Sequence, residues 1–86
     1  MQVLATARYL RAYKKLPKQV REKTKKAIQQ LMTDMAHPGL QVKRIRGTKD
    51  IYEARVDRGV RFTFEINNDN IILRNVGEHD KTLSNP

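Results

Sequence analysis

The spacing of the apolar residues changes at Pro38-Gly39, and this change constrains the fold more than any other feature of the sequence. Before it, one stripe at helical spacing lies opposite a face of Lys and Arg and consists of Val20, Thr24, Ala27, Ile28, Leu31 and Met35. Pro17 suits the first turn of this helix. We expect the helix to end near Ala36, because Pro38 disfavours helical geometry at the residue before it and Gly39 permits a reversal. Beyond Gly39 the sequence is typical of a sheet.

The N-terminal residues predict a strand followed by another helix. Met1 to Ala5 is short and apolar, as expected of an edge strand, and Thr6 can cap a helix. Tyr9, Tyr13 and Leu16 then follow helical spacing. The chain is therefore expected to begin with a strand and a pair of helices.

Three runs typical of β-strands follow the basic segment Lys43-Arg44-Ile45-Arg46-Gly47. They are Ile51 to Val56, Val60 to Ile66 and Ile71 to Val76. The loops between them are Asp57-Arg58-Gly59 and an Asn-rich turn, so the runs predict two hairpins. A chain of this length supports one hydrophobic core, and residues 1–86 are expected to form a single α+β domain.

The first hairpin loop sets which residues face the core. If Asp57-Arg58-Gly59 is a three-residue loop with Gly59 in the left-handed conformation, one face becomes apolar. The facing pairs are then Val56 with Val60, Ala54 with Phe62 and Tyr52 with Phe64. A two-residue loop would mix apolar and charged residues on both faces, so burial favours the three-residue register. We expect the helices to cover the apolar face.

The opposite face of this sheet is charged. It carries Glu53, Arg55, Arg61, Thr63, Glu65, Ile72, Arg74 and Val76. Arg55 lies directly opposite Arg61, and like charges in this position destabilise a hairpin. An anion between the two guanidinium groups would relieve the repulsion, which indicates a phosphate site. Alternatively, both side chains splay into solvent or pair with Glu53 and Glu65.

The charge of the chain points to a polyanionic partner. The sequence has 18 Lys and Arg against 9 Asp and Glu, a net charge of +9 that favours nucleic acid or an acidic protein. With no cysteine and only His37 and His79, neither a disulfide nor a metal or other cofactor is expected. No apolar run approaches the roughly 18 residues of a membrane span, and the N-terminus does not resemble a signal peptide. We expect a cytoplasmic protein without membrane contact.

The residues that could do chemistry are few, because phosphate-binding Gly loops, nucleophile elbows and metal-spaced histidines are missing from the sequence. What remains is the arginine cluster, with His79 just beyond the last strand. RNA cleavage by its own 2′-hydroxyl needs a base, cations on the phosphate and an acid for the leaving 5′ oxygen, and no metal. Arg61 suits the phosphate clamp and His79 the proton transfer. Alternatively, His79 is a solvated histidine in a terminal turn.

Four local motifs carry a family resemblance. They are Lys15-Leu16-Pro17, Arg44-Ile45-Arg46-Gly47, Gly59-Val60-Arg61-Phe62-Thr63-Phe64 and Val76-Gly77-Glu78-His79. In this order and spacing they resemble the RelE/ParE toxin superfamily over essentially the whole chain. The resemblance implies an N-terminal strand and a helical hairpin packed on a twisted, mainly antiparallel sheet of about four to five strands. It also implies the toxin of a type II toxin–antitoxin system, an mRNA interferase that cleaves mRNA in the ribosomal A site by metal-independent 2′-hydroxyl attack.

The resemblance assigns roles to individual residues. Arg61 matches the strand arginine at the scissile phosphate, His79 resembles the terminal histidine of YafQ-like members, and Lys81 can substitute for a catalytic basic residue. The expected RNA- or phosphate-binding residues are Lys43, Arg44, Arg46, Arg55 and Arg74. The sequence departs from RelE at its end, where residues 82–86 contain no tyrosine to match the late aromatic residue of the family. Another side chain then supplies that group, or activity is low or absent.

The implied partners are an acidic antitoxin, mRNA and the ribosome at its 16S rRNA. The toxin–antitoxin complex is expected to bind operator DNA through the antitoxin. Two other functions remain open for the sequence: a ParE-like inhibitor of DNA gyrase, which needs no proton transfer, and a non-catalytic RNA- or ribosome-binding protein.

Overall fold

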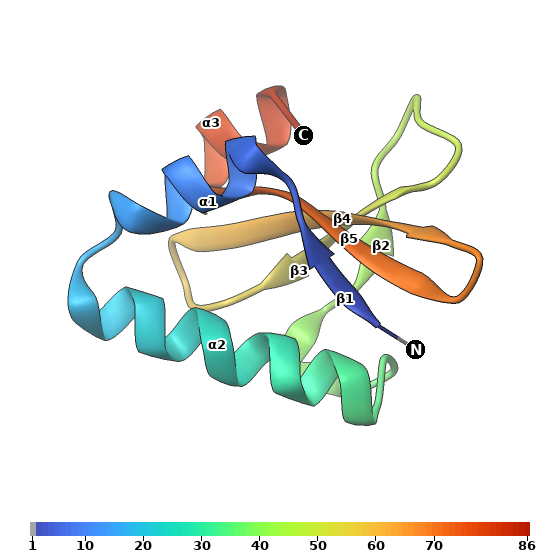
Figure 1. Ribbon diagram of the computed structural model, residues 1–86, viewed down its shortest axis with the longest axis horizontal. Coiled ribbons are helices and arrows are strands. Elements are labelled where there is room, and N and C mark those ends of the chain that lie inside the picture. Colours follow the sequence, from blue (N-terminus) through green and yellow to red (C-terminus); the bar gives the residue numbers. More distant parts are fainter. Residues whose placement is uncertain (1) are drawn as a thin grey trace.

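The structure is a computed structural model that describes residues 2–86, and it consists of one mixed sheet with helices on both faces (Figure 1). The elements are β1 (Val3–Ala5), α1 (Ala7–Lys14), α2 (Lys18–Thr33), a 3-10 turn (Pro38–Leu40), β2 (Lys43–Arg44), β3 (Ile51–Arg55), β4 (Val60–Asn67), β5 (Asn70–Glu78) and α3 (His79–Ser84). The strand order is β1-β5-β4-β3-β2, with β1 parallel to β5 and all other pairs antiparallel. The predicted α+β fold is confirmed, although Met1 lies outside the described residues.

The helices begin and end for local reasons. Thr6 caps α1 as expected, since its Oγ1 accepts a hydrogen bond from the backbone N–H of Tyr9 at 3.1 Å. Pro17 precedes α2 as its cap, with an extended ψ of 152°, rather than lying in the first turn. The helix ends at Thr33 and not near Ala36, because Asp34 is extended and its carboxylate accepts a hydrogen bond from Ala36 N–H at 3.0 Å. Within residues 2–86, no helix has the length and apolar character needed to cross a bilayer.

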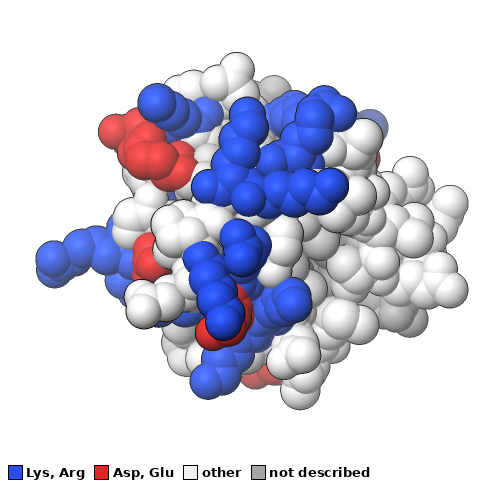
Figure 2. Space-filling view, turned by 60° about the vertical axis from the view of Figure 1, so that its left-hand side comes forward, with Lys and Arg blue, Asp and Glu red and all other residues white. Residues whose placement is uncertain are grey.

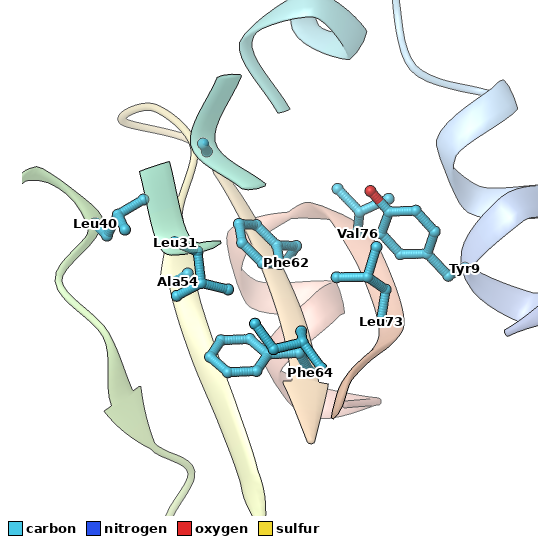
Figure 3. Packing of buried hydrophobic residues seen from close by; sticks show 10 residues of the cluster. Tyr9, Leu31, Leu40, Ala54, Phe62, Phe64, Leu73 and Val76 are labelled. Atoms are coloured by element: carbon cyan, nitrogen blue, oxygen red, sulfur yellow. The ribbon is translucent and has the colours of Figure 1, made fainter. Parts of the chain in front are cut away.

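The hydrophobic core lies between the sheet and the α1–α2 pair (Figure 3). Phe62 and Phe64 of β4 are fully buried, and Leu31 of α2 packs against this part of the sheet. Tyr9 of α1 covers the β5 side of the core. Each large apolar side chain buried in this way contributes roughly 1.5–3 kcal/mol to stability, so these contacts fix the sheet that carries the charged residues.

The register of the first hairpin is the one expected from burial, with Ala54 opposite Phe62 and Tyr52 opposite Phe64. The loop geometry is different. Gly59 does not adopt a left-handed conformation, and instead its N–H donates to the Asp57 carboxylate at 3.0 Å. The side chain of Asp57 therefore closes the turn, and the backbone freedom of glycine is not needed there.

A β-bulge changes which side of the sheet the side chains of β5 lie on. The register shifts between Thr63 and Phe64, which pair with Asn75 and Leu73, so that Arg74 is the extra residue. Val76 consequently turns inward opposite Phe62 and is buried in the core. The prediction that Val76 lies on the charged face is wrong, because simple alternation cannot include an inserted residue.

The charged face of the sheet is partly covered by α3, which the sequence did not predict. The Glu78 carboxylate caps this helix by accepting from the N–H groups of Asp80 and Lys81 at 3.0 and 3.1 Å. Thr63, in the middle of β4, is completely buried, and its hydroxyl donates to the Pro86 carbonyl at 3.0 Å. The open part of this face therefore lies toward the ends of the strands.

Candidate functional site

Arg61 lies where β4 leaves the β3–β4 loop, and the loop holds its side chain. Its Nη1 donates to the carbonyls of Asp57 and Val60 at 2.7 and 3.1 Å. Its strand neighbours are Arg55 on β3 and Gly77 on β5. Among residues 2–86 no carboxylate forms an ion pair with Arg61. The loop thus orients a guanidinium group without neutralising its charge.

The predicted pairing of Arg55 with Arg61 is present, since the two residues are direct cross-strand partners. Pairing with neighbouring carboxylates does not relieve it: Glu65 binds Arg74 instead, and within the described part of the chain Glu53 has no ion pair. Both arginines are half-buried. Two partly desolvated cations side by side make this end of the sheet suitable for an anion.

His79 is tied to the same loop. Its backbone N–H donates to the Gly59 carbonyl at 2.9 Å, which fixes the start of α3 at the β3–β4 loop. The ring Nδ1 lies 2.9 Å from the Asp80 carboxylate, and the side chain is 43 % exposed. Nε2 has no hydrogen-bond partner within residues 2–86. A carboxylate on one ring nitrogen and an open second nitrogen is an arrangement that can transfer a proton.

The basic segment before β3 lies at the far edge of the sheet. Lys43 and Arg44 form the edge strand β2 and pair with Glu53 and Tyr52. Successive strand residues face opposite sides, so Lys43 shares the charged face with Glu53 whereas Arg44 lies on the side of Tyr52. One strand separates β2 from β4, a distance of about 10 Å. The segment, with Arg46 in the exposed turn beyond it, forms a rim and does not surround Arg61.

Arg74 has protein partners already. Its Nη1 forms an ion pair with the Glu65 carboxylate at 3.0 Å, and its Nε donates to the Pro86 carbonyl at 3.0 Å. Of the residues expected at the site, the structure therefore gathers Arg55, Arg61 and His79 at one end of the sheet, whereas Arg74 is bound to Glu65 and Pro86.

Arg55 lines a hollow of about 150 Å³ beside α2, together with Lys23 and Lys26.

Similar proteins of known structure share this architecture, whereas no protein-family model and no curated protein matches the sequence. RelE of the RelB–RelE antitoxin–toxin complex from Methanococcus jannaschii is 25% identical, with a TM-score of 0.75 over 95% of each chain. The toxin of the Escherichia coli RelBE toxin–antitoxin complex is 21% identical, with a TM-score of 0.74 over 92% of this chain and 96% of that one. YafQ from E. coli gives a TM-score of 0.78 at 10% identity, over 93% and 94%. This chain has the RelE toxin fold. The resemblance expected from the sequence motifs is confirmed.

The tyrosines of this RelE-like chain do not replace the missing late aromatic residue. Tyr52 stacks on Phe64 with ring centroids 5.6 Å apart, on the side of the sheet away from Arg61. Tyr9 is 3% exposed, and burial, with a smaller contribution from Tyr13, raises the pKa of its hydroxyl well above the usual range. Tyr13 donates to the Arg21 carbonyl at 3.2 Å. Tyr9, Tyr13 and Tyr52 therefore offer no hydroxyl group to the candidate site.

Sequence reasoning missed a second basic region of the RelE-like fold. A pocket of about 430 Å³ opens between α1 and α3, and its cationic lining residues are Arg8, Arg11, Lys15 and Lys81. The structure thus places Lys81 beside α1. The spacing of Arg8, Arg11 and Lys15 on the expected first helix is the signal that could have revealed this region, because residues three and four apart share a helix face.

Proposed function

We propose that this chain is the toxin of a type II toxin–antitoxin system and that it cleaves mRNA as an endoribonuclease. The observation that carries the proposal is that Arg61 of β4 and His79 of α3 are both hydrogen-bonded to the β3–β4 loop. The Arg61 guanidinium is oriented by the carbonyls of Asp57 in the loop and Val60 of β4, and His79 is anchored to the Gly59 carbonyl with one ring nitrogen open. The RelE fold, whose known members include toxins of toxin–antitoxin complexes, supports the same function.

The chemistry that this pair can perform is attack of an RNA 2′-hydroxyl on the adjacent phosphorus. Arg61 binds the phosphate oxygens and stabilises the negative charge that builds up in the transition state, a contribution of about 10²- to 10³-fold in rate for one preorganised donor. His79 donates a proton to the departing 5′ oxygen, a contribution of about 10²- to 10⁴-fold. The P–O5′ bond breaks, the 2′-hydroxyl proton passes to water, and the products carry a 2′,3′-cyclic phosphate and a 5′-hydroxyl. No metal takes part in this sequence.

We further propose an acidic antitoxin as the partner that controls the toxin. The net charge of +9 favours such a partner, and the M. jannaschii and E. coli relatives are complexes of a RelE toxin with its antitoxin. An acidic segment over Arg44, Arg46 and Arg61 would occupy the anion site and block RNA, with an affinity that falls as salt rises. The complex then binds operator DNA through the antitoxin, and the free toxin acts in the cytoplasm on mRNA in the ribosomal A site.

The function is tested by inducing the chain from a repressed promoter and mapping new RNA 5′ ends in the arrested cells. We expect growth arrest with new ends inside coding regions, and neither with Arg61→Ala. Arg58→Ala is the matched control, because Arg58 lies exposed in the same loop. Growth arrest with inhibited DNA supercoiling and no new ends would assign gyrase inhibition instead. Ribosome binding without cleavage would assign a non-catalytic binding protein.

A further inference from the structure

The pocket between α1 and α3 is formed where the sheet loses its edge strand. β1 ends at Ala5, opposite Leu73, so strand pairing on this edge of β5 stops there. The next part of β5, residues 75–78, forms one wall of the pocket, and the helices α1 and α3 form the others. Its volume of about 430 Å³ falls within the range of small-ligand sites, roughly 300–1,000 Å³.

The pocket is strongly positive, because four cations and one carboxylate line it. Arg8, Arg11, Lys15 and Lys81 are all exposed, and within residues 2–86 none forms an ion pair with a carboxylate. Glu78 is the acidic residue of the lining, but both of its oxygens already accept backbone N–H groups at the start of α3. Figure 2 shows Lys and Arg side chains spread over the end of the molecule with the α1–α2 turn, and fewer acidic residues among them.

The cations on α1 repel one another when no anion is bound, which destabilises the helix. Arg8 and Arg11 are three residues apart on α1, and Lys15, the C-cap residue, follows Arg11 by four, so like charges lie next to one another on one face. α1 contains no acidic residue to offset them. An anion bound between α1 and α3 would reverse the sign of this interaction, because every neighbouring cation would then attract it.

We propose that the pocket binds phosphate groups of the RNA backbone on one side of the scissile phosphate. This inference rests on the proposed function for its choice of RNA as the polyanion. The pocket is continuous with the candidate site through β5: Gly77 lines the pocket and is the strand neighbour of Arg61, and Glu78 lines it directly before His79. Guanidinium groups bind phosphate oxygens two at a time, which suits Arg11 to this role. Arg8 donates from Nη2 to the Asn85 carbonyl and has further N–H groups for a phosphate. Lys81 is here a binding residue of the same RNA strand.

The binding test uses a fluorescently labelled 2′-O-methyl RNA decamer, which lacks the attacking hydroxyl and stays intact. Its affinity is measured by anisotropy across a salt series for the wild type and for Arg11→Gln/Lys15→Gln. We expect the double variant to bind about 10-fold more weakly, with a salt slope smaller by about 1.4, since each phosphate contact to a single strand contributes about 0.7. Lys81→Gln, from the opposite wall, should lower the slope by about 0.7.

The matched control is Lys18→Gln/Lys25→Gln, which removes the same charge from exposed positions of α2 outside the pocket. We expect this pair to change the affinity by less than about 3-fold, because distant surface charges are screened. Equal losses in the two double variants would overturn the proposal, since net charge alone would then explain binding. Circular dichroism verifies that each variant is folded, and Arg11→Lys/Lys15→Arg, which keeps both charges, should keep the wild-type salt slope.

A polyglutamate decapeptide distinguishes RNA from an acidic protein. If Arg11→Gln/Lys15→Gln weakens binding of this peptide and leaves RNA binding unchanged, the pocket belongs to a protein partner and the proposal is overturned. Because the decamer cannot be cleaved, the result is independent of activity. If the wild-type chain binds the decamer through the pocket but never cleaves RNA, the proposed function is refuted and the proposed phosphate site is supported. If the wild-type chain cleaves RNA but Arg11→Gln/Lys15→Gln binds the decamer normally, the proposed function is supported and the proposed phosphate site is refuted.

Discussion

Replacing Arg61 by alanine should remove activity and leave the protein folded. The contacts of Arg61 allow an estimate of the loss in the free energy of unfolding and in the cleavage rate. The substitution deletes two hydrogen bonds from a half-buried guanidinium to the carbonyls of Asp57 and Val60, at 2.7 and 3.1 Å. Bonds of this kind contribute about 0.5–1.5 kcal/mol each, and partial exposure favours the lower half of that range, so we expect a loss of about 1–2 kcal/mol. A domain of this size has a free energy of unfolding of about 5–10 kcal/mol, and therefore most molecules remain folded. Loss of the phosphate clamp should slow cleavage by about 10²- to 10³-fold.

The assay combines urea unfolding with single-turnover cleavage under conditions in which the variant is folded. Arg61→Lys keeps the charge but not the planar fork, so it should recover only part of the rate. Arg58→Ala should leave both stability and cleavage near the wild-type values, because Arg58 is exposed in the loop. An Arg61→Ala protein that is unfolded, or whose rate falls no further than its folded fraction, would show that Arg61 is a structural residue of the loop.

Three further predictions concern single side chains. His79→Gln should slow cleavage by about 10²- to 10⁴-fold with little change in RNA affinity, and a near-normal single-turnover rate would remove His79 from the mechanism. Tyr9→Phe should raise the free energy of unfolding by about 1 kcal/mol, because the buried Tyr9 hydroxyl has no hydrogen-bond partner within residues 2–86; a loss of stability in urea unfolding would contradict this. Thr6→Ala should lower it by about 1 kcal/mol through loss of the α1 cap, and an unchanged thermal midpoint would show that the cap contributes nothing.

The elements that the sequence predicted are those in which apolar residues repeat over several turns or strand pairs. Burial of Phe62 and Phe64 is possible in one hairpin register only, so the pairing of β3 with β4 followed from the pattern. The loop conformation could not be predicted from the pattern. The Asp57 carboxylate and a left-handed glycine are both compatible with the same strand register. The bulge at Thr63 could not be predicted either, since a single inserted residue does not change the composition of the strand.

The candidate site was predicted in part for the same reasons. Arg61 and Arg55 come together through strand register, which the sequence determines. Helix α3 spans six residues, too few for a periodic apolar pattern, so the cover over Thr63 was not foreseen. The engagement of Arg74 by Pro86 depends on that cover, and so does the position of Lys81 against α1. Contacts between distant segments decide which cations stay available for an anion.

RNA cleavage by this RelE-fold protein is tested most directly with the purified protein on ribosomes that carry a defined mRNA. The same mRNA, free in solution with a chelator, is the second substrate. We expect cleavage within the ribosomal A site that leaves a 2′,3′-cyclic phosphate and a 5′-hydroxyl, and that is lost with Arg61→Ala. Intact mRNA on the ribosome and in free solution, with toxin that is folded and bound to RNA, would contradict it.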